Sequence, residues 1–398
     1  MTVAVSIKNL DVVFGKKVGP ALALLEQGKT RQEIIEATGQ VVGVQDASIE
    51  VQRGEICVLM GLSGSGKSSL LRAVNGLNPI SRGELRVQDG DQMVNMASCD
   101  AKTLRHMRST RVSMVFQKFA LMPWLSVLDN VAFGLEMQGI SKPERRRRAM
   151  EKLAMVGLDE WSSKLPHELS GGMQQRVGLA RAFAMDSDIL LMDEPFSALD
   201  PLIRNQLQDE LLELQRKLSK TIIFVSHDLD EALKIGTHIA IMESARIIQH
   251  GRPEDIVLNP CNEYVRNFVA HTNPLNVLKG RSLMTGLDQL ERLDEMLVLN
   301  RAENSWFRMD AQGQLLSASR QETALQLHQW ESSSTLNDLD EGTLVVASPD
   351  ISMREALEIR YQTGLPVLLR EASGLVGVLR DRDFYHALLG KHFGTETA

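Results

Sequence analysis

Short apolar runs alternate with longer amphipathic stretches over the first two-thirds of the 398-residue chain. The runs EICVLMG, RVSMVFQ, DILLMDE and TIIFVSHD have the length of strands, and a polar or helical pattern follows each of them. Uninterrupted apolar runs with β-branched residues are typical of strands covered on both faces, as in a parallel sheet. The pattern therefore predicts an α/β fold of the nucleotide-binding kind.

Residues 16–41 interrupt this alternation between the apolar runs VVFG and VGVQDASIEV. Thr30, followed three residues later by Glu33, is typical of a capping box that begins a helix. We therefore expect a helical insertion over residues 16–41. A solvated helical hairpin without chemistry is the simplest interpretation of it.

Beyond about residue 270 the pattern changes. The stretch HTNPLNVLKG predicts a linker over residues 271–281, and two weakly similar units follow at 297–327 and 344–389. The first unit predicts the strands SWFRM and QLLSA around the turn DAQG, and then a helix. The second predicts a helix capped by Ser352 and Glu355, and a hairpin of PVLL and LVGVL. A repeated unit indicates a small pseudo-symmetric α+β domain over residues 282–398.

Composition and charge narrow the class of protein. The chain has 44 basic and 51 acidic residues and a net charge of −7, which argues against a nucleic-acid binder. Its three cysteines, Cys57, Cys99 and Cys261, lie far apart, a pattern that suits a reducing cytosol and no structural metal. No apolar run approaches the roughly 20 residues that a membrane span needs, so a membrane role would require a partner.

The stretch GLSGSGKSS matches the phosphate loop G-x-x-x-x-G-K-[ST] between a predicted strand and a predicted helix. Its glycines let backbone N–H groups approach phosphates, and the helix adds its positive N-terminal end. Lys67 would reach the outer phosphates, and Ser68 would hold Mg²⁺. The candidate nucleotide-binding residues of this loop are Gly61, Leu62, Ser63, Gly64, Ser65, Gly66, Lys67, Ser68 and Ser69.

Polar side chains end three other predicted strands, at the sheet edge where ligands bind in such folds. Asp193 ends ILLMD and would reach Mg²⁺, and Glu194 would polarise an attacking water molecule. Gln117 ends VSMVFQ and would offer its amide oxygen to Mg²⁺ or to water. His227 is a candidate γ-phosphate contact, although a lone histidine is more often a helix cap or a core residue.

The stretch ELSGGMQQR, residues 168–176, also places a serine before two glycines, but it lacks a lysine. Over about residues 1–270 the chain resembles the ATP-binding cassette (ABC) ATPases. Six ordered motifs carry the resemblance: the phosphate loop at 61–68, Gln117, the signature LSGGM at 169–173, Asp193-Glu194, SALD at 197–200, and His227. Met173 stands where this signature more often has glutamine, whereas Ser170, Gly171 and Gly172 are intact.

The resemblance implies that two cassettes pair head to tail, with each ATP between the phosphate loop of one copy and the signature of the other. Ser170 and Gly172 would then touch the γ-phosphate held by the other copy, with Gly171 as a further nucleotide-binding residue, and Asp200 would link the two sites. A chain with one loop and one signature implies an ATP-closed homodimer, with ATP and Mg²⁺ as cofactors. Phe14, the one aromatic residue upstream of the phosphate loop, would stack on adenine; an ordinary core phenylalanine is the alternative.

Residues 118–172 correspond to the helical subdomain that, in ABC transporters, grips a helix of the membrane subunit. The basic run at 145–148 is most simply a solvated helix face, with attraction to anionic lipid as the alternative. This region also carries an apolar string, of which about half would serve a core: Phe119, Leu121, Met122, Pro123 and Trp124.

Two further stretches, LSGGMQQRVGLARA and HDLDEALKIGTHIAIM, together with the insertion and the tail, resemble the ATPases of glycine betaine, proline and choline importers. This resemblance implies uptake of a quaternary amine through integral-membrane permease subunits and an extracytoplasmic solute-binding protein. The chain would lie peripherally on the cytoplasmic face of the inner membrane. A soluble regulatory ATPase without a permease is the alternative.

The tail, residues 282–398, resembles a degenerate pair of cystathionine-β-synthase-type (CBS) repeats. In GVLRDRD, Gly377 and Asp383 fit the adenosine-binding pattern of such repeats, but Arg380 replaces its hydroxyl residue. The resemblance implies a regulatory or dimerising module that responds to ionic strength or to a ligand. A structural remnant is the alternative.

Overall fold

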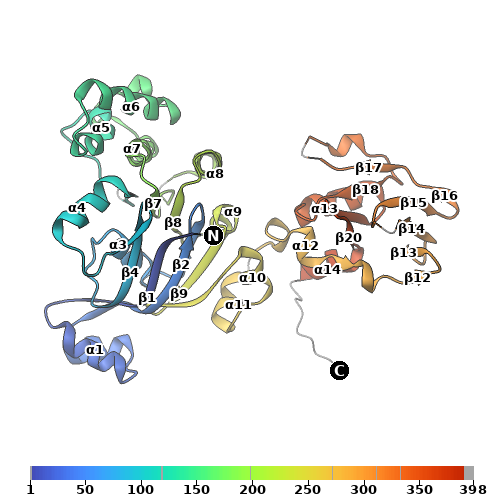
Figure 1. Ribbon diagram of the computed structural model, residues 1–398, viewed down its shortest axis with the longest axis horizontal. Coiled ribbons are helices and arrows are strands. Elements are labelled where there is room, and N and C mark those ends of the chain that lie inside the picture. Colours follow the sequence, from blue (N-terminus) through green and yellow to red (C-terminus); the bar gives the residue numbers. More distant parts are fainter. Residues whose placement is uncertain are drawn as a thin grey trace. The chain divides into compact units, whose positions relative to one another are not determined.

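The chain folds into two compact units, Met1–Arg252 and Pro253–Ala398 (Figure 1). The structure, a computed structural model, describes residues 2–117, 120–197, 199–270, 272–310, 312–331 and 333–389. The division after Arg252 falls earlier than the position near residue 270 at which the sequence pattern changes. Helices α10 (Pro253–Leu258) and α11 (Glu263–Val269) accordingly belong to the second unit.

A six-stranded sheet with the order β10-β9-β3-β8-β7-β6 forms the centre of the first unit. Its neighbours pair in parallel except β9 and β10, which form an antiparallel edge. Strands β3, β7 and β8 are buried at every position, which confirms the parallel sheet expected from their apolar runs. The strands are β3 (Ile56–Met60), β6 (Val112–Val115), β7 (Ile189–Asp193), β8 (Thr221–Val225), β9 (His238–Glu243) and β10 (Arg246–Gly251).

An antiparallel sheet with the order β2-β1-β4-β5 shares a core with the central sheet. Helix α3 (Lys67–Val74) contributes Leu70 and Leu71 to this core, which also contains Leu85 of the antiparallel sheet and Leu191 of the central one. This packing fixes the N-terminal end of α3, where the phosphate loop ends. The strands are β1 (Val3–Phe14), β2 (Val41–Gln52), β4 (Arg82–Asp89) and β5 (Gln92–Asn95).

The insertion between β1 and β2 is helical, as the sequence predicts. It consists of α1 (Val18–Glu26) and α2 (Arg31–Thr38). The Thr30 side chain accepts the Glu33 N–H, and the Glu33 carboxylate accepts the Thr30 N–H, so the predicted capping box is confirmed. The hydrogen bond from the Thr30 backbone and the nearby Lys29 lower the pKa of Glu33 to about 2.

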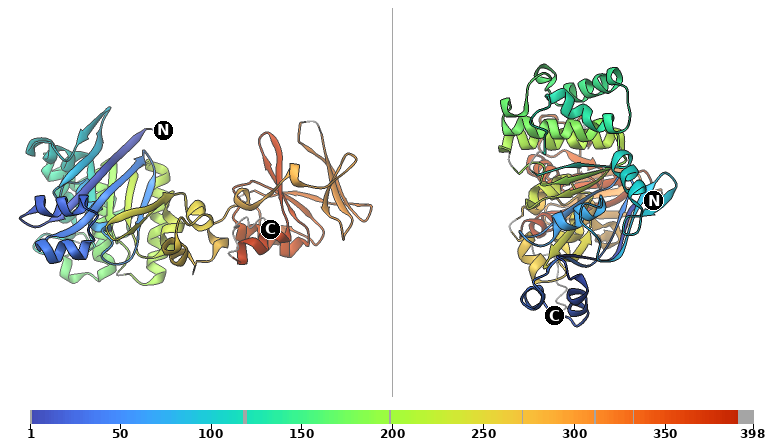
Figure 2. Two further views of the ribbon diagram at one scale, coloured as in Figure 1. Left: turned by 90° about the horizontal axis from the view of Figure 1, so that it is seen from below. Right: turned by 90° about the vertical axis from the view of Figure 1, so that its left-hand side faces the viewer.

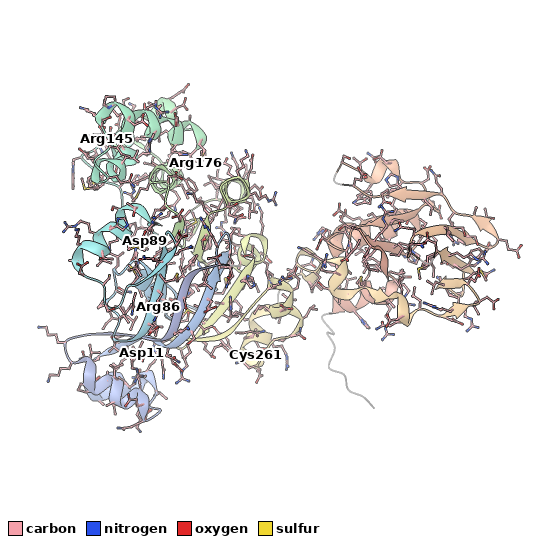
Figure 3. All side chains as sticks on the ribbon, in the orientation of Figure 1. Asp11, Arg86, Asp89, Arg145, Arg176 and Cys261 are labelled. Atoms are coloured by element: carbon pink, nitrogen blue, oxygen red, sulfur yellow. The ribbon has the colours of Figure 1, made fainter. Side chains whose placement is uncertain are left out.

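Helices α5 (Val127–Met137), α6 (Lys142–Met155) and α7 (Gly171–Ala184) form a layer with a core of its own, visible as a separate group in Figure 2. All four arginines of the run at 145–148 pair with acidic side chains, which supports a solvated helix face. Attraction of this run to lipid stays a hypothesis. Arg145 on α6 and Arg176 on α7 mark this layer in Figure 3. The remaining helices of the unit are α4 (Ala101–Thr110), α8 (Pro201–Leu218) and α9 (Leu229–Ile235).

The second unit contains two five-stranded sheets, with the orders β11-β20-β19-β18-β17 and β12-β13-β14-β15-β16. Its helices are α12 (Gly280–Leu283), α13 (Met353–Thr363) and α14 (Asp381–Leu389), besides α10 and α11. The strands are β11 (Thr285–Gly286), β12 (Arg292–Leu293), β13 (Met296–Asn300), β14 (Ser305–Met309), β15 (Leu315–Arg320), β16 (Thr323–Ala324), β17 (Leu327–Gln329), β18 (Leu344–Ala347), β19 (Val367–Glu371) and β20 (Gly374–Leu379).

The two repeat units of the tail fold differently. The second follows the predicted order of helix and hairpin, with Ser352 accepting the Glu355 N–H at the start of α13. In the first, the strands β14 and β15 are present, but the helix expected after them is wrong. Gln321 and Glu322 have φ of 50° and 68° and close a two-residue hairpin between β15 and β16. Two consecutive left-handed residues form such a hairpin turn, and strand pairing therefore overrides the helical pattern.

Asp383, the tail residue matched to adenosine-binding repeats, is buried among protein partners. Its carboxylate accepts the Arg380 N–H at 2.8 Å and the Thr285 hydroxyl at 3.2 Å. Burial raises the pKa of Asp383. The Asp383 carboxylate therefore makes hydrogen bonds to groups of its own chain at the start of α14.

Candidate nucleotide-binding site

The phosphate loop runs from the end of β3 to the start of α3, and close packing requires two of its glycines, Gly61 and Gly66. A Cβ on Gly61 would lie 2.1 Å from the Met242 carbonyl oxygen, and one on Gly66 would lie 2.4 Å from the Gly43 carbonyl oxygen. Both glycines have φ above 100°, at 140° and 102°. Gly64, with φ of 79°, faces open space instead. The loop is therefore pressed against β2 and β9 on one side and open on the other.

Lys67 spans the mouth of this loop. Its Nζ donates to the carbonyl oxygens of Gly61 at 2.7 Å and Leu62 at 3.0 Å. The residue is only 6 % exposed. Burial lowers the pKa of Lys67, whereas the nearby carboxylates of Glu194 and Asp193 act to raise it. The ammonium group is thus held at the mouth of the loop by two loop carbonyls.

Asp193, fully buried at the end of β7, connects the phosphate loop to the central sheet. Its Oδ1 accepts the Ser68 hydroxyl at 2.7 Å, and its Oδ2 accepts Nη2 of Arg72 at 2.8 Å. Sequence reasoning missed Arg72, although it follows Ser68 by four residues and so lies on the same face of α3. The predicted pair Ser68 and Asp193 therefore comes together, with oxygen donors of the kind that Mg²⁺ prefers.

The side chain of Glu194 contacts residues that follow β6 and β8, the two strands beside β7. Its Oε2 accepts Nε2 of Gln117 at 3.1 Å and lies 3.3 Å from Nδ1 of His227. The backbone of Glu194 has φ of 46°, an uncommon conformation for a residue with a side chain. This turn directs the carboxylate away from the strand and toward Gln117 and His227. Strained backbone of this kind is concentrated at functional sites.

Phe14 ends β1 and lies beside the start of α3. A Cβ on Gly43 would lie 2.4 Å from Cε2 of Phe14 and 3.1 Å from the Ser69 hydroxyl oxygen, so the ring covers Gly43 next to the loop. Part of the ring packs against the core. The structure thus brings Phe14 to the phosphate loop despite the insertion between them in the sequence.

The insertion itself contacts the phosphate loop. Nη1 of Arg31, the first residue of α2, donates to the Gly64 carbonyl oxygen at 2.9 Å. Sequence reasoning gave no role to Arg31, because the residue stands 33 positions from Gly64 and belongs to no motif. The hairpin of α1 and α2 is therefore more than a solvated excursion.

The signature lies apart from these residues. Ser170 caps α7, its hydroxyl accepting the Met173 N–H at 3.3 Å, and Gly171 and Gly172 form the first turn. In the described part of the chain, no hydrogen bond joins residues 169–173 to the phosphate loop. Asp200 caps α8 by accepting the Ile203 N–H at 3.0 Å; Ala198 in the same motif lies outside the described residues. One chain therefore brings Asp193 and Phe14 to the phosphate loop, whereas the signature of the same chain makes no hydrogen bond to that loop in the described residues.

Comparison with known proteins decides the family. Residues 44–197 match the family model described as ABC transporter. The chain is 41 % identical to the glycine betaine transport ATP-binding protein OpuAA of Bacillus subtilis, over 98 % of this chain and 93 % of that relative. The chain belongs to the ABC transporter family.

Two other comparisons agree with this assignment. The glycine betaine/proline betaine transport ATP-binding protein ProV of Escherichia coli is 52 % identical over 67 % of this chain and 66 % of that relative. The dimeric structure of the ATP-binding cassette MJ0796 bound to ADP and Pi is 28 % identical, with a TM-score of 0.54, and covers 63 % of this chain and 98 % of that one.

This membership confirms the fold class and the activity that the motifs predict. The chain is an ABC ATPase that binds ATP, and its ATPase activity is coupled to transport. Among the residues that the structure describes, no helix is both long and apolar enough to cross a membrane.

Proposed function

We propose that this ABC ATPase drives the uptake of a quaternary-ammonium solute, with glycine betaine or choline as the first candidates. The relatives support the solute class, since their names specify glycine betaine, proline betaine, carnitine and trimethylamine N-oxide. These solutes share a methylated, positively charged nitrogen. No residue of this chain touches the solute in this proposal. Integral-membrane permease subunits and an extracytoplasmic solute-binding protein select it.

The site residues divide into phosphate binding, metal binding and water activation. The N–H groups of residues 61–69 and the Lys67 ammonium bind the phosphates, and Phe14 stacks on the adenine. Ser68, Asp193 and Gln117 supply oxygen donors for Mg²⁺, which when bound neutralises phosphate charge.

Glu194 is the general base in this proposal. The observation that carries the assignment is its carboxylate, held by Gln117 at 3.1 Å and His227 at 3.3 Å at the edge of the loop. A carboxylate positioned in this way accepts a proton from the attacking water. His227 then faces the γ-phosphate. Positioning and charge stabilisation supply most of the rate enhancement in phosphoryl transfer.

A second copy completes each site. The signature presents the hydroxyl of Ser170 and the N-terminal end of α7, including the Gly171 and Gly172 N–H groups, at an exposed surface. A helix N-terminus is a natural anion site, and this one has no lysine beside it. We infer a head-to-tail homodimer in which the signature of one copy caps the ATP of the other, with Asp200 at the interface.

An apolar groove suits a membrane subunit. It has a volume of about 820 Å³ and lies between α4, α5, α7 and the segment after β6. Asn130, fully buried, holds its rim by bonding to both the N–H and the carbonyl of Met122. Of the apolar string predicted here, Met122 lines the groove, Leu121 packs into the helical layer, Trp124 is 74 % exposed, and Phe119 lies outside the described residues. The apolar lining includes Leu104, Phe116, Met122, Phe133, Met137 and Met185.

We propose that a cytoplasmic helix of the permease docks in this groove, which would hold the ATPase at the cytoplasmic face of the membrane. Met137→Arg on the exposed rim should reduce recovery of the permease with the tagged ATPase from detergent extracts. Trp161→Arg, an exposed aromatic residue outside the groove, is the matched control. Unchanged recovery with Met137→Arg would contradict docking in the groove.

The variant Glu194→Gln tests the catalytic part of the proposal. It keeps the shape of the side chain but cannot accept the proton, so hydrolysis should fall by about 100-fold or more. ATP binding should persist, and closed dimer should accumulate, as measured by light scattering with ATP. Glu213→Gln on the exposed side of α8 is the matched control. Turnover at the parental rate in Glu194→Gln would remove Glu194 from the mechanism.

Uptake by the reconstituted complex tests the solute. Labelled glycine betaine and labelled choline should accumulate in vesicles only with ATP and only with the parental Glu194. Competition with unlabelled proline, carnitine and trimethylamine N-oxide ranks the solute class. Accumulation of none of these amines would contradict the proposed solute, but would leave the ATPase assignment intact.

A further inference from the structure

Four side chains able to bind a metal gather at the amino end of β3, the end remote from the phosphate loop. They are Glu55, Cys57, His238 and His250. Ligand atoms of Glu55, Cys57 and His250 all lie within 4.8 Å of one another. Nδ1 of His238 is 3.2 Å from Oε1 of Glu55, and the two histidine rings are 5.5 Å apart.

Strand pairing brings these residues to one face of the central sheet. Cys57 of β3 pairs with His238 of β9, and His250 of β10 pairs with Ala240. Ala240 is two residues from His238, and Glu55 is two residues from Cys57. Side chains two apart on a strand share a face, so Cys57, His238 and His250 point the same way. Glu55 immediately precedes β3, and its carboxylate lies within 4.8 Å of the ligand atoms of Cys57 and His250. The cluster therefore belongs to three adjacent strands and not to one segment.

Two buried polar atoms of the cluster, one on Glu55 and one on His238, have no hydrogen-bond partner. Glu55 is only 6 % exposed, and its Oε1 and Nδ1 of His238 are both buried without a hydrogen bond, although they lie 3.2 Å apart. The other oxygen of Glu55 is held by the Gln52 N–H at 2.7 Å. An ordinary ion pair would join Glu55 and His238 by a hydrogen bond. Buried polar atoms are rarely left unpaired, so this arrangement indicates a missing partner common to both.

We propose that Glu55, Cys57 and His250 bind a zinc ion, and that His238, whose Nδ1 lies 3.2 Å from Glu55, moves in as the fourth ligand. One thiolate, one carboxylate and two imidazoles are a donor set that suits Zn²⁺ and excludes Mg²⁺ or Ca²⁺ as the preferred ion. Ligand atoms around tetrahedral zinc are roughly 3.3–3.8 Å apart, which lies within the 4.8 Å that bounds three of them here. Binding replaces the thiol proton of Cys57, and that proton is released to solvent.

The position of the cluster suggests a structural role. His250 is exposed, which gives the ion a path from solvent, whereas Cys57 and Glu55 are buried. A bound ion joins β3, β9 and β10 at one edge of the sheet. Cys57 lies four residues before Gly61, or roughly 13 Å along the strand, so the ion is separate from the nucleotide. The zinc ion thus stabilises the sheet that carries the phosphate loop.

Cobalt binding to the full-length protein tests the proposal, because a thiolate–Co²⁺ bond gives a charge-transfer absorption band. The parent should bind about one equivalent of Zn²⁺ in equilibrium dialysis and show this band with Co²⁺. Cys57→Ser should abolish the band. Cys99→Ser and Cys261→Ser are the matched controls and should keep it; Cys261 lies between α10 and α11 in the second unit (Figure 3).

A second variant covers the case in which Cys57→Ser does not fold. His250→Gln removes an exposed ligand, so folding should persist by circular dichroism, while zinc affinity should fall about tenfold or more. Added ZnCl₂ should raise the melting temperature of the parent but not of His250→Gln. Any one of three results would overturn the proposal. The parent could show no cobalt band, or the band could be lost only in Cys99→Ser or Cys261→Ser. The third is an equal zinc-induced shift of the melting temperature in the parent and His250→Gln.

Discussion

The phosphate loop and the signature both place serine and glycine before a helix, but their surroundings differ. Gly61 and Gly66 of the loop touch neighbouring backbone and have positive φ, and Lys67 is buried between loop carbonyls. In the signature, Gly172 is helical, and a Cβ there would meet only the tip of the Leu199 side chain at 3.3 Å. The loop is packed against neighbouring backbone on one side, whereas the first turn of the signature helix meets only a side chain.

This difference explains why one protein carries two serine-glycine segments. In the proposed site, the loop N–H groups and Lys67 bind the phosphates and Asp193 binds Mg²⁺, so all of these groups come from one chain. The signature offers a hydroxyl and a helix dipole but no counter-charge on a side chain. In the proposed homodimer, the signature receives the phosphate of the ATP that the other copy holds.

Loss of the Lys67 charge should have the largest effect. Lys67→Ala removes a buried ammonium that would make charge-assisted hydrogen bonds to phosphate, so ATP affinity should fall by about 100-fold or more. Titration with a fluorescent ATP analogue measures this. Lys102→Ala on the exposed face of α4 is the matched control. Binding within threefold of the parent in Lys67→Ala would show that the loop does not depend on its lysine.

The variant Gly172→Asp should separate binding from hydrolysis. An aspartate in the first turn favours the helix, so α7 should fold, but its carboxylate would repel the γ-phosphate of the facing copy. ATP binding should stay within about twofold, and hydrolysis should fall by roughly 100-fold with loss of the ATP-dependent dimer. Ser141→Asp, at the start of α6, adds the same charge elsewhere in the helical layer. Full hydrolysis by Gly172→Asp would contradict a signature that acts on ATP.

Mixing the two inactive variants sharpens the comparison further. A dimer of one Lys67→Ala chain and one Gly172→Asp chain has one intact loop facing one intact signature. An equal mixture contains half mixed dimers with one working site each, so about a quarter of parental hydrolysis should return. Neither variant alone should show this activity. If mixed dimers form, as judged by two different tags, and no activity returns, the composite site is contradicted.

Much of the candidate site could be predicted from the sequence because its parts are short motifs at the ends of strands. Gln117, Asp193 and His227 each end an apolar run, and a parallel sheet brings such ends to one edge. The capping box at Thr30 and Glu33 was local in the same way. Arg31 and Asn130 were not predicted, because their partners, Gly64 and Met122, follow from tertiary packing and not from spacing.

The remaining differences also come from contacts distant in sequence. In the first tail unit, the hairpin at Gln321 and Glu322 replaced a predicted helix because β15 offered a partner strand. The wide spacing of the cysteines along the chain predicts no structural metal, whereas the zinc site proposed above would join residues from three strands. Cys57 and His250 come together only through the pairing of β3, β9 and β10. A site built across strands leaves no motif in the sequence.

Replacing Phe14 should have the smallest effect, and it tests the phosphate-loop side of the nucleotide site but not the signature. Phe14→Ala removes a ring that would stack on adenine, which is worth about 1–3 kcal/mol, so ATP affinity should fall roughly tenfold. Phe14→Tyr keeps the aromatic face and should bind like the parent. Because the ring also packs against the core, thermal unfolding must be measured beside ATP affinity. A lower melting temperature with unchanged ATP affinity in Phe14→Ala would assign Phe14 to the core. Weaker ATP binding by Phe14→Ala, with the effect of Gly172→Asp on hydrolysis unchanged, would instead place the ring on adenine.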